Sequence, residues 1–173
     1  MESWGGLRTA SSRRSLEQPV GGVVLGGDYQ GLGIVRSLGR RGIPVYVVDD
    51  EPAVARFSRY TTQFLRVSDL RHERSIIETV LEIGKRFRLE GWVLYATRDE
   101  IVAALSRGRD QLRSLFRVPT PPWKTVKYAD DKRLTYQLAA RLGIPTPRTW
   151  YPASRAALRP WAGIPRLRFA GRM

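Results

Sequence analysis

The sequence predicts an α/β fold in which a parallel sheet is covered by helices on both faces. Short apolar runs alternate along the chain with longer segments in which apolar residues recur every three or four positions. The first pattern is typical of buried parallel strands and the second of amphipathic helices. The connections are rich in glycine, proline and acidic residues, which end strands and helices. Because the two patterns alternate, we expect parallel strands joined by right-handed helical crossovers.

The first strand is predicted at residues 20–25, where an apolar run ends in Gly26-Gly27. A helix is expected at about residues 31–41 and a second buried strand at 43–48, and these three elements make a βαβ unit. The acidic cluster Asp49-Asp50-Glu51 closes the second strand. The apolar stripe of the helix consists of Leu32, Val35 and Leu38.

The alternation continues with a third strand at 63–67 and a helix at about 70–87. A fourth strand is predicted at 92–96. Thr97-Arg98-Asp99-Glu100 then has the Thr-x-x-Glu spacing of a capping box, so one helix should run from there to about residue 116. The core side of the helix at 70–87 consists of Ile76, Ile77, Val80, Leu81 and Ile83.

The composition excludes several kinds of site. There is no cysteine, which removes disulfides and thiolate chemistry and fits a reducing cytoplasm, where we expect the protein. His72 is the only histidine, so it forms no multi-histidine site, and its position indicates an exposed helix start. No run reaches the roughly 20 apolar residues of a membrane span. The P-loop and nucleophile-elbow spacings are absent, and the acids form no recognisable metal spacing.

The formal net charge of +14 makes nucleic acid a partner to consider. More than a third of that charge lies in residues 151–173, which hold five arginines and no acid. Elsewhere the arginines are scattered among acids, without a basic stripe interleaved with aromatic residues. We therefore expect neither a nucleic-acid partner nor a membrane partner.

Residues 26–33 form a glycine-rich turn in which backbone N–H groups at a helix N-terminus could face a phosphate or carboxylate. The spacing is not the dinucleotide fingerprint. If Gly31 is taken as the first glycine of G-x-G-x-x-G, the third glycine is missing. If Gly27 is taken as the first, the second is missing. Asp49 ends the second strand, where a ribose-binding acid would lie, but acids at strand ends are also common turn formers. A purely structural turn stays open as the alternative.

Residues 123–147 are predicted to contain a capped helix. Asp130 or Asp131 supplies the N-cap, and Gly143 followed by Pro145 ends the helix. Its apolar stripe consists of Leu134, Leu138 and Leu142. A helix that opens with Asp131-Lys132 and ends in Gly-Ile-Pro-x-Pro, after an α/β domain, resembles the ATP-grasp superfamily. The resemblance covers residues 20 to about 152, including the glycine turn and the Asp99-Glu100 helix start.

The resemblance implies a Rossmann-like pre-ATP-grasp domain at 20–123 and, at 124–152, a linker helix that starts the ATP-grasp region. It implies an enzyme that uses ATP and Mg²⁺ to activate a carboxylate for attack by an amine. Lys132 would reach the nucleotide phosphates, and the alternative is an exposed helix lysine. The carboxylate would bind at the strand ends, where parallel sheets bind ligands. The residues expected there are Gly26, Gly27, Gly31, Gly33, Thr97, Asp99 and Glu100.

Outside these ranges we expect a mobile leader at 1–19 and a basic, irregular tail at 153–173. Gly163-Ile164-Pro165 resembles the start of the next family strand, but arginines follow where that strand would run into Lys-Pro. We expect a truncated or frame-shifted reading that lacks the catalytic lobe and is inactive alone, with the lobe encoded in adjacent sequence or another frame. A short family variant with a basic tail is the alternative.

Two other functions stay open at this point. One is a small NAD(P)- or nucleotide-binding Rossmann module, in which the glycine turn binds a pyrophosphate and Asp49 binds a ribose. The other is a basic nucleic-acid-binding protein whose affinity depends on the arginine-rich tail and falls steeply with salt.

Overall fold

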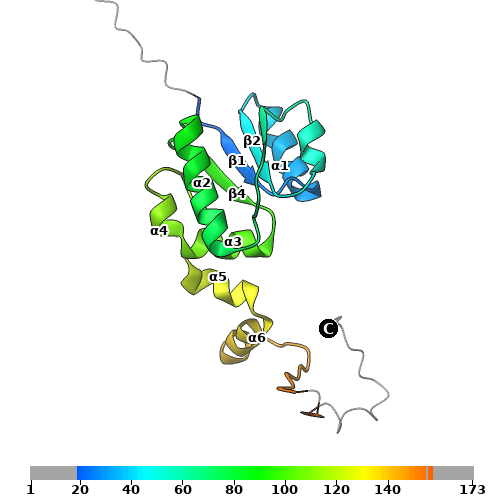
Figure 1. Ribbon diagram of the computed structural model, residues 1–173. Coiled ribbons are helices and arrows are strands. Elements are labelled where there is room, and N and C mark those ends of the chain that lie inside the picture. Colours follow the sequence, from blue (N-terminus) through cyan, green and yellow to red (C-terminus); the bar gives the residue numbers. More distant parts are fainter. Residues whose placement is uncertain (1–18, 155, 158–173) are drawn as a thin grey trace, which may run out of the picture. The chain divides into compact units, whose positions relative to one another are not determined.

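A computed structural model describes residues 19–154 and 156–157 (Figure 1). The predicted leader up to residue 18 and the predicted tail from residue 158, with Gly163-Ile164-Pro165, lie outside the described residues. The chain divides into two compact units between Val126 and Lys127. Within the part of the chain that the structure describes, no helix is both long and apolar enough to cross a membrane.

Four parallel strands form the sheet of the first unit, in the order β3-β2-β1-β4. The central strand β1 pairs on one side with β2 and on the other with β4, so that Leu25 lies opposite both Val48 and Ala96. The predicted parallel sheet is confirmed, and β2 reaches one residue further than expected, to Asp49. The strands are β1 (Gly22–Leu25), β2 (Val45–Asp49), β3 (Gln63–Arg66) and β4 (Val93–Ala96).

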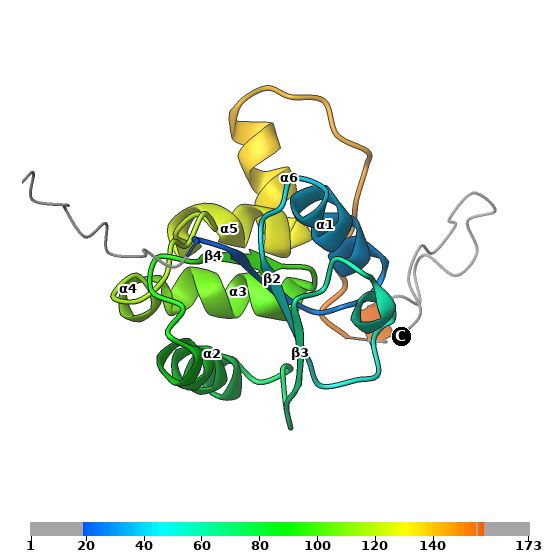
Figure 2. The same ribbon diagram turned by 90° about the horizontal axis from the view of Figure 1, so that it is seen from above.

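Helices cover both faces of the sheet, as Figure 2 shows. α1 (Tyr29–Gly39) and the 3₁₀ helix η1 (Val54–Phe57) lie on one face. α2 (Glu73–Phe87), α3 (Asp99–Arg107) and α4 (Arg109–Leu112) lie on the other. The Rossmann-like α/β fold is thereby confirmed.

The alternation of side chains along β1 creates two separate cores. Val24 packs in the smaller core, with Val35 of α1. Val23 and Leu25 pack in the larger core, and both are almost completely buried. The side chains that α2, α3 and α4 contribute to the larger core include Ile76, Val80, Ile101, Leu105 and Leu112.

α1 begins at Tyr29, two residues before its predicted start, because Asp28 is its N-cap and accepts a hydrogen bond from the Gly31 N–H at 3.3 Å. The predicted exposed helix start at His72 is confirmed. His72 is the N-cap residue of α2, and its side chain is 83% exposed.

The predicted capping box at Thr97 is wrong. The N-cap residue of α3 is Arg98, which makes no side-chain capping bond. The Thr97 hydroxyl instead donates to the carbonyl oxygens of Leu25 and Gly26, at 3.1 and 3.3 Å. The single helix to residue 116 is also wrong, because the chain turns at Gly108 and continues in the short α4. Both errors arise from contacts that local spacing does not encode.

α5 (Trp123–Asp130) spans the division between the units, and α6 (Lys132–Arg141) lies in the second unit. α6 is the predicted capped helix, and Asp131 caps it by accepting a hydrogen bond from the Arg133 N–H at 2.8 Å. Gly143, with a φ of 68°, lies just after its end. The sequence patterns did not indicate α5, whose first turn bonds to the carbonyl of Pro122. No residue of α6 is buried.

Two glycines of α1 offer a matched test of the turn. A Cβ atom at Gly31 would lie 2.2 Å from the carbonyl oxygen of Gly26, whereas one at Gly33 would meet no atom within 4 Å. Gly31→Ala should therefore lower the free energy of unfolding by about 1–3 kcal/mol. Gly33→Ala should raise it by about 0.5–1 kcal/mol, because alanine loses less backbone entropy in a helix. Urea denaturation measures both, and equal effects would contradict this packing.

Candidate functional site

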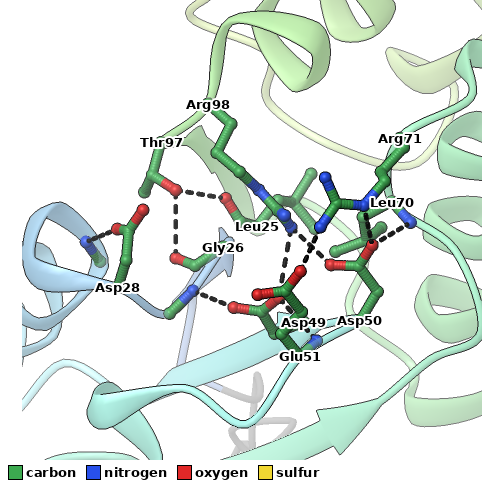
Figure 3. A network of polar contacts seen from close by, with 12 residues as sticks. Leu25, Gly26, Asp28, Asp49, Asp50, Glu51, Leu70, Arg71, Thr97 and Arg98 are labelled. Carbon is green, nitrogen blue, oxygen red and sulfur yellow. Dashed lines mark hydrogen bonds and ion pairs between the residues drawn. The ribbon is translucent and has the colours of Figure 1, made fainter.

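The carboxyl ends of β1, β2 and β4 meet at one edge of the sheet (Figure 3). β1 and β4 are neighbours, but their following helices α1 and α3 cover opposite faces. This is the topological switch point at which open parallel sheets bind ligands. The side chains and loops that surround it therefore make up the candidate site.

Asp49 links the β1 turn to the end of β2. Its carboxylate accepts a hydrogen bond from the Gly27 N–H at 2.6 Å and another from the Glu51 N–H at 3.1 Å. The residue is only 4% exposed. Burial of a carboxylate is tolerated only with such partners. Asp49 is thus occupied in holding the glycine turn against the sheet.

Arg98 supplies the opposite charge. One of its terminal nitrogens lies 3.2 Å from Asp49 and 2.9 Å from Asp50, between the two carboxylates (Figure 3). Its Nε is buried without a hydrogen-bond partner in the described part of the chain, and the nearest carboxylate, Glu100, is 3.9 Å away. Because Arg98 follows β4, it joins the ends of β4 and β2 across the central strand.

Asp50 extends this network to the start of α2. Its side chain accepts a hydrogen bond of 3.2 Å from the Leu70 N–H and forms an ion pair of 3.4 Å with Arg71. Arg71 also forms an ion pair with Glu51. Burial alone would raise the pKa of Asp50, but the hydrogen bonds from Arg98 and Leu70 and the charge of Arg98 lower that pKa below its ordinary 3.8. The carboxylate therefore stays ionised in the folded protein.

The β1 turn itself is closely packed. Gly26 has a φ of 92°, a conformation that favours glycine, and a Cβ atom there would lie 2.1 Å from the Thr97 hydroxyl oxygen. The turn keeps two open donors, because no acceptor within the described residues pairs with the N–H groups of Tyr29 and Gln30. Asp28, which caps α1, places a negative charge beside them.

The structure distributes the predicted substrate residues unevenly. Gly26, Gly27 and Thr97 lie together at the switch point. Gly31 and Gly33 lie inside α1, Gly31 packed on the turn and Gly33 exposed on the helix surface. Asp99 and Glu100 form the first turn of α3, beside Arg98. Lys132 is exposed at the first position of α6, in the second unit.

Sequence reasoning expected Asp50 and Arg98 near the strand ends but gave neither of them, nor Arg71, a role in the site. Their partners lie about 20 to 49 residues away along the chain, so no local spacing indicates them. The only available signal was that Arg98 and the acids at 49–51 lie at or just after the end of a strand. Within the described residues, no group of three or more acids and histidines is placed to hold a metal ion.

No protein-family model matches the sequence, and no curated protein matches it. The structure is similar to the crystal structure of an L-amino acid ligase from Bacillus licheniformis, with a TM-score of 0.58 and 13% sequence identity. The match covers 78% of this chain and 36% of the ligase chain. The chain therefore spans about a third of the length of that ligase, with which it shares an α/β fold.

The Arg98 network should contribute strongly to stability. Arg98→Met would leave Asp49 and Asp50, each with a side chain only 6% exposed, without their shared cation. We expect the free energy of unfolding at pH 7 to fall by about 3 kcal/mol. Arg74→Met, which removes an exposed pair with Glu78, should cause no measurable change. Urea denaturation of the two variants would contradict this account if their stabilities were equal.

Stability should also fall in acid. Hydrogen bonding to the Arg71 N–H lowers the pKa of Asp69 to about 2, and the pKa of Asp50 is lowered as well. Because these folded-state values lie below the unfolded value of 3.8, both groups stabilise the fold above pH 4 and lose that effect as the pH falls towards 2. Urea midpoints measured from pH 6 to about 2 should decline below pH 4. Asp69→Asn should flatten that decline, and an unchanged slope would contradict it.

Proposed function

We propose that this chain forms the first domain and linker helix of an ATP-grasp ligase that activates the carboxylate of an amino acid for attack by an amine. The observation that carries the proposal is the order of two features. A Rossmann-like domain is followed by a helix that opens at the capped pair Asp131-Lys132. The shared fold with an L-amino acid ligase supports it.

The switch point suits an amino acid better than a simple anion. The open N–H groups of Tyr29 and Gln30 lie at the N-terminus of α1, where a carboxylate is favoured. The Asp28 carboxylate takes part in none of the ion pairs among the described residues, and that of Glu100, in the first turn of α3, has only a contact of 3.9 Å with Arg98, so both would attract an ammonium group. A substrate that carries both charges meets both requirements.

In this proposal Lys132 contacts the nucleotide phosphates. Asp131 accepts a hydrogen bond from the Arg133 N–H and forms an ion pair of 3.0 Å with the Arg133 side chain. The carboxylate next to Lys132 is therefore already paired with Arg133. Lys132 is exposed and begins the helix. Mg²⁺ would neutralise the phosphate charge, but no metal group occurs within the described residues, so its ligands would come from elsewhere in the enzyme.

The alternative of a dinucleotide-binding module finds little support. It requires Asp49 to accept hydrogen bonds from a ribose, but both carboxylate oxygens are already bonded to Gly27, Glu51 and Arg98. The Gly27 N–H is also bonded to Asp49, at 2.6 Å, which leaves a pyrophosphate only the N–H groups of Tyr29 and Gln30. A ribose would have to break a buried network before it could bind Asp49.

ATP should bind this chain weakly and at one place. A single charge contact at an exposed lysine is worth about 0–1 kcal/mol, whereas micromolar affinity requires about 8 kcal/mol. In amide NMR spectra of the chain, ATP with Mg²⁺ should shift the signals of Asp131–Arg133 only at millimolar concentration, and it should not turn over. Lys132→Ala should abolish those shifts, whereas Lys124→Ala, at another exposed lysine, should preserve them.

The same spectra test the substrate site and the alternative. An amino acid should shift the amides of Tyr29, Gln30 and Glu100. Simple carboxylates without an ammonium group should shift them less, because Asp28 and Glu100 repel them. Micromolar binding of NAD(P) with shifts at residues 26–33 would contradict the proposal and favour the dinucleotide-binding module. Steady release of ADP would contradict the expectation that further residues are needed for catalysis.

A further inference from the structure

An arginine–aromatic surface lies on the α1 side of the sheet. Its residues come from the end of α1, from η1 and the loop that follows, and from β3. Tyr60 and Phe64 are half-buried against the smaller core, whereas Phe57 is 78% exposed. The surface consists of Arg40, Arg56, Phe57, Arg59, Tyr60 and Phe64.

The arginines of this surface lie over its rings. The guanidinium carbon of Arg56 is 4.6 Å from the ring centroid of Phe57 and 6.0 Å from that of Phe64. Arg59 lies 4.8 Å from the ring centroid of Tyr60 and donates a hydrogen bond of 2.7 Å to its hydroxyl. These cation–π contacts hold the positive charges in a layer on the aromatic side chains.

Arg40 belongs to the same surface although it is 16 or more residues away from the others in sequence. Tyr60 packs directly on the last turn of α1, since a Cβ atom at Gly39 would lie 2.4 Å from the Cβ of Tyr60. The hydrogen bond from Arg59 lowers the pKa of the Tyr60 hydroxyl, and the charge of Arg40 lowers it further. The structure thus gathers bases that are separate in the sequence.

No acid balances this charge locally. There is no aspartate or glutamate between Tyr29 and Val48 or between Pro52 and Ser68, and these two stretches hold six arginines. None of the ion pairs among the described residues involves Arg40, Arg56 or Arg59. Three arginines elsewhere in the first unit, Arg74, Arg98 and Arg107, are by contrast paired with carboxylates. This surface is therefore an uncompensated positive patch.

We propose that the arginine–aromatic surface binds single-stranded nucleic acid, with Phe57 stacking on a base and Arg40, Arg56 and Arg59 contacting phosphates. Exposed rings interleaved with bases are the combination that binds single strands without strong sequence preference. The proposal uses no residue of the switch point, so it is independent of the proposed ligase function.

Other occupants fit the surface less well. A second copy of the chain would bring the same positive patch against itself, and like charges repel. A membrane surface is usually bound by an apolar helix face or an anchor, but the apolar side chain Val35 of α1 is buried in the core and η1 is a single short turn. An exposed aromatic ring such as that of Phe57 matches the face of a base.

Fluorescence anisotropy of the full chain with a labelled oligothymidine of about 16 nucleotides tests the proposal. The logarithm of the affinity should fall with the logarithm of salt concentration with a slope of about −2, as three phosphate contacts require. Phe57→Ala should weaken binding about fivefold or more. Arg59→Gln should weaken it and bring the slope about 0.7 closer to zero.

Matched controls separate this surface from general charge. Val54→Ala removes exposed apolar surface from the same turn, and Arg113→Gln removes one exposed charge from another part of the first unit. Neither should weaken binding as Phe57→Ala and Arg59→Gln do. A variant in which the five arginines of residues 151–173 are glutamine should still bind and remain sensitive to Phe57→Ala.

Three results would overturn the proposal. The first is no binding of the oligonucleotide at low salt, and the second is binding that disappears with the tail arginines alone. The third is that the chain binds anionic lipid vesicles or polyglutamate but not oligothymidine, and that Phe57→Ala and Arg59→Gln abolish this binding. That result would assign the surface to a membrane or to an acidic protein.

Discussion

The buried carboxylate of Asp49 is the constraint on which the candidate site depends. It accepts hydrogen bonds from the Gly27 N–H in the β1 turn and from the Arg98 side chain at the end of β4. It thereby links three strands at one edge of the sheet. The residue is only 4% exposed, and a buried carboxylate is destabilising without such partners. The conformation of the glycine turn, with Gly26 at a φ of 92°, is consequently fixed by the protein itself and does not await a ligand.

The fold was predictable because the patterns that specify it are local. Apolar runs ending in glycine or acids predicted the strands to within about two residues. Segments with one apolar stripe predicted the covering helices, but with larger errors at their ends. The errors arose where a side chain with a local capping pattern forms its hydrogen bonds with distant residues instead. Thr97 has the spacing of a cap, but its hydroxyl donates to the carbonyl oxygens of Leu25 and Gly26, more than 70 residues earlier.

The site was less predictable because its ion pairs cross between strands. Arg98 stands between two residues that the sequence indicated, yet only the parallel pairing of β1 with β2 and β4 brings it to Asp49 and Asp50. The arginine–aromatic surface follows the same rule, since Arg40 meets Tyr60 only after α1 has packed on the sheet. The expectation of scattered bases holds along the sequence, whereas the folded chain concentrates several of them on one surface.

Hydrogen exchange of the Gly27 amide tests the central role of Asp49 most directly. If the hydrogen bond of 2.6 Å from Gly27 to Asp49 is part of the folded framework, this amide should exchange as slowly as the amides of the central strand β1, through global unfolding. Its protection should remain unchanged when phosphate, ATP or an amino acid is added. Exchange as fast as that of an exposed loop amide would show that the turn is open, and would contradict the account.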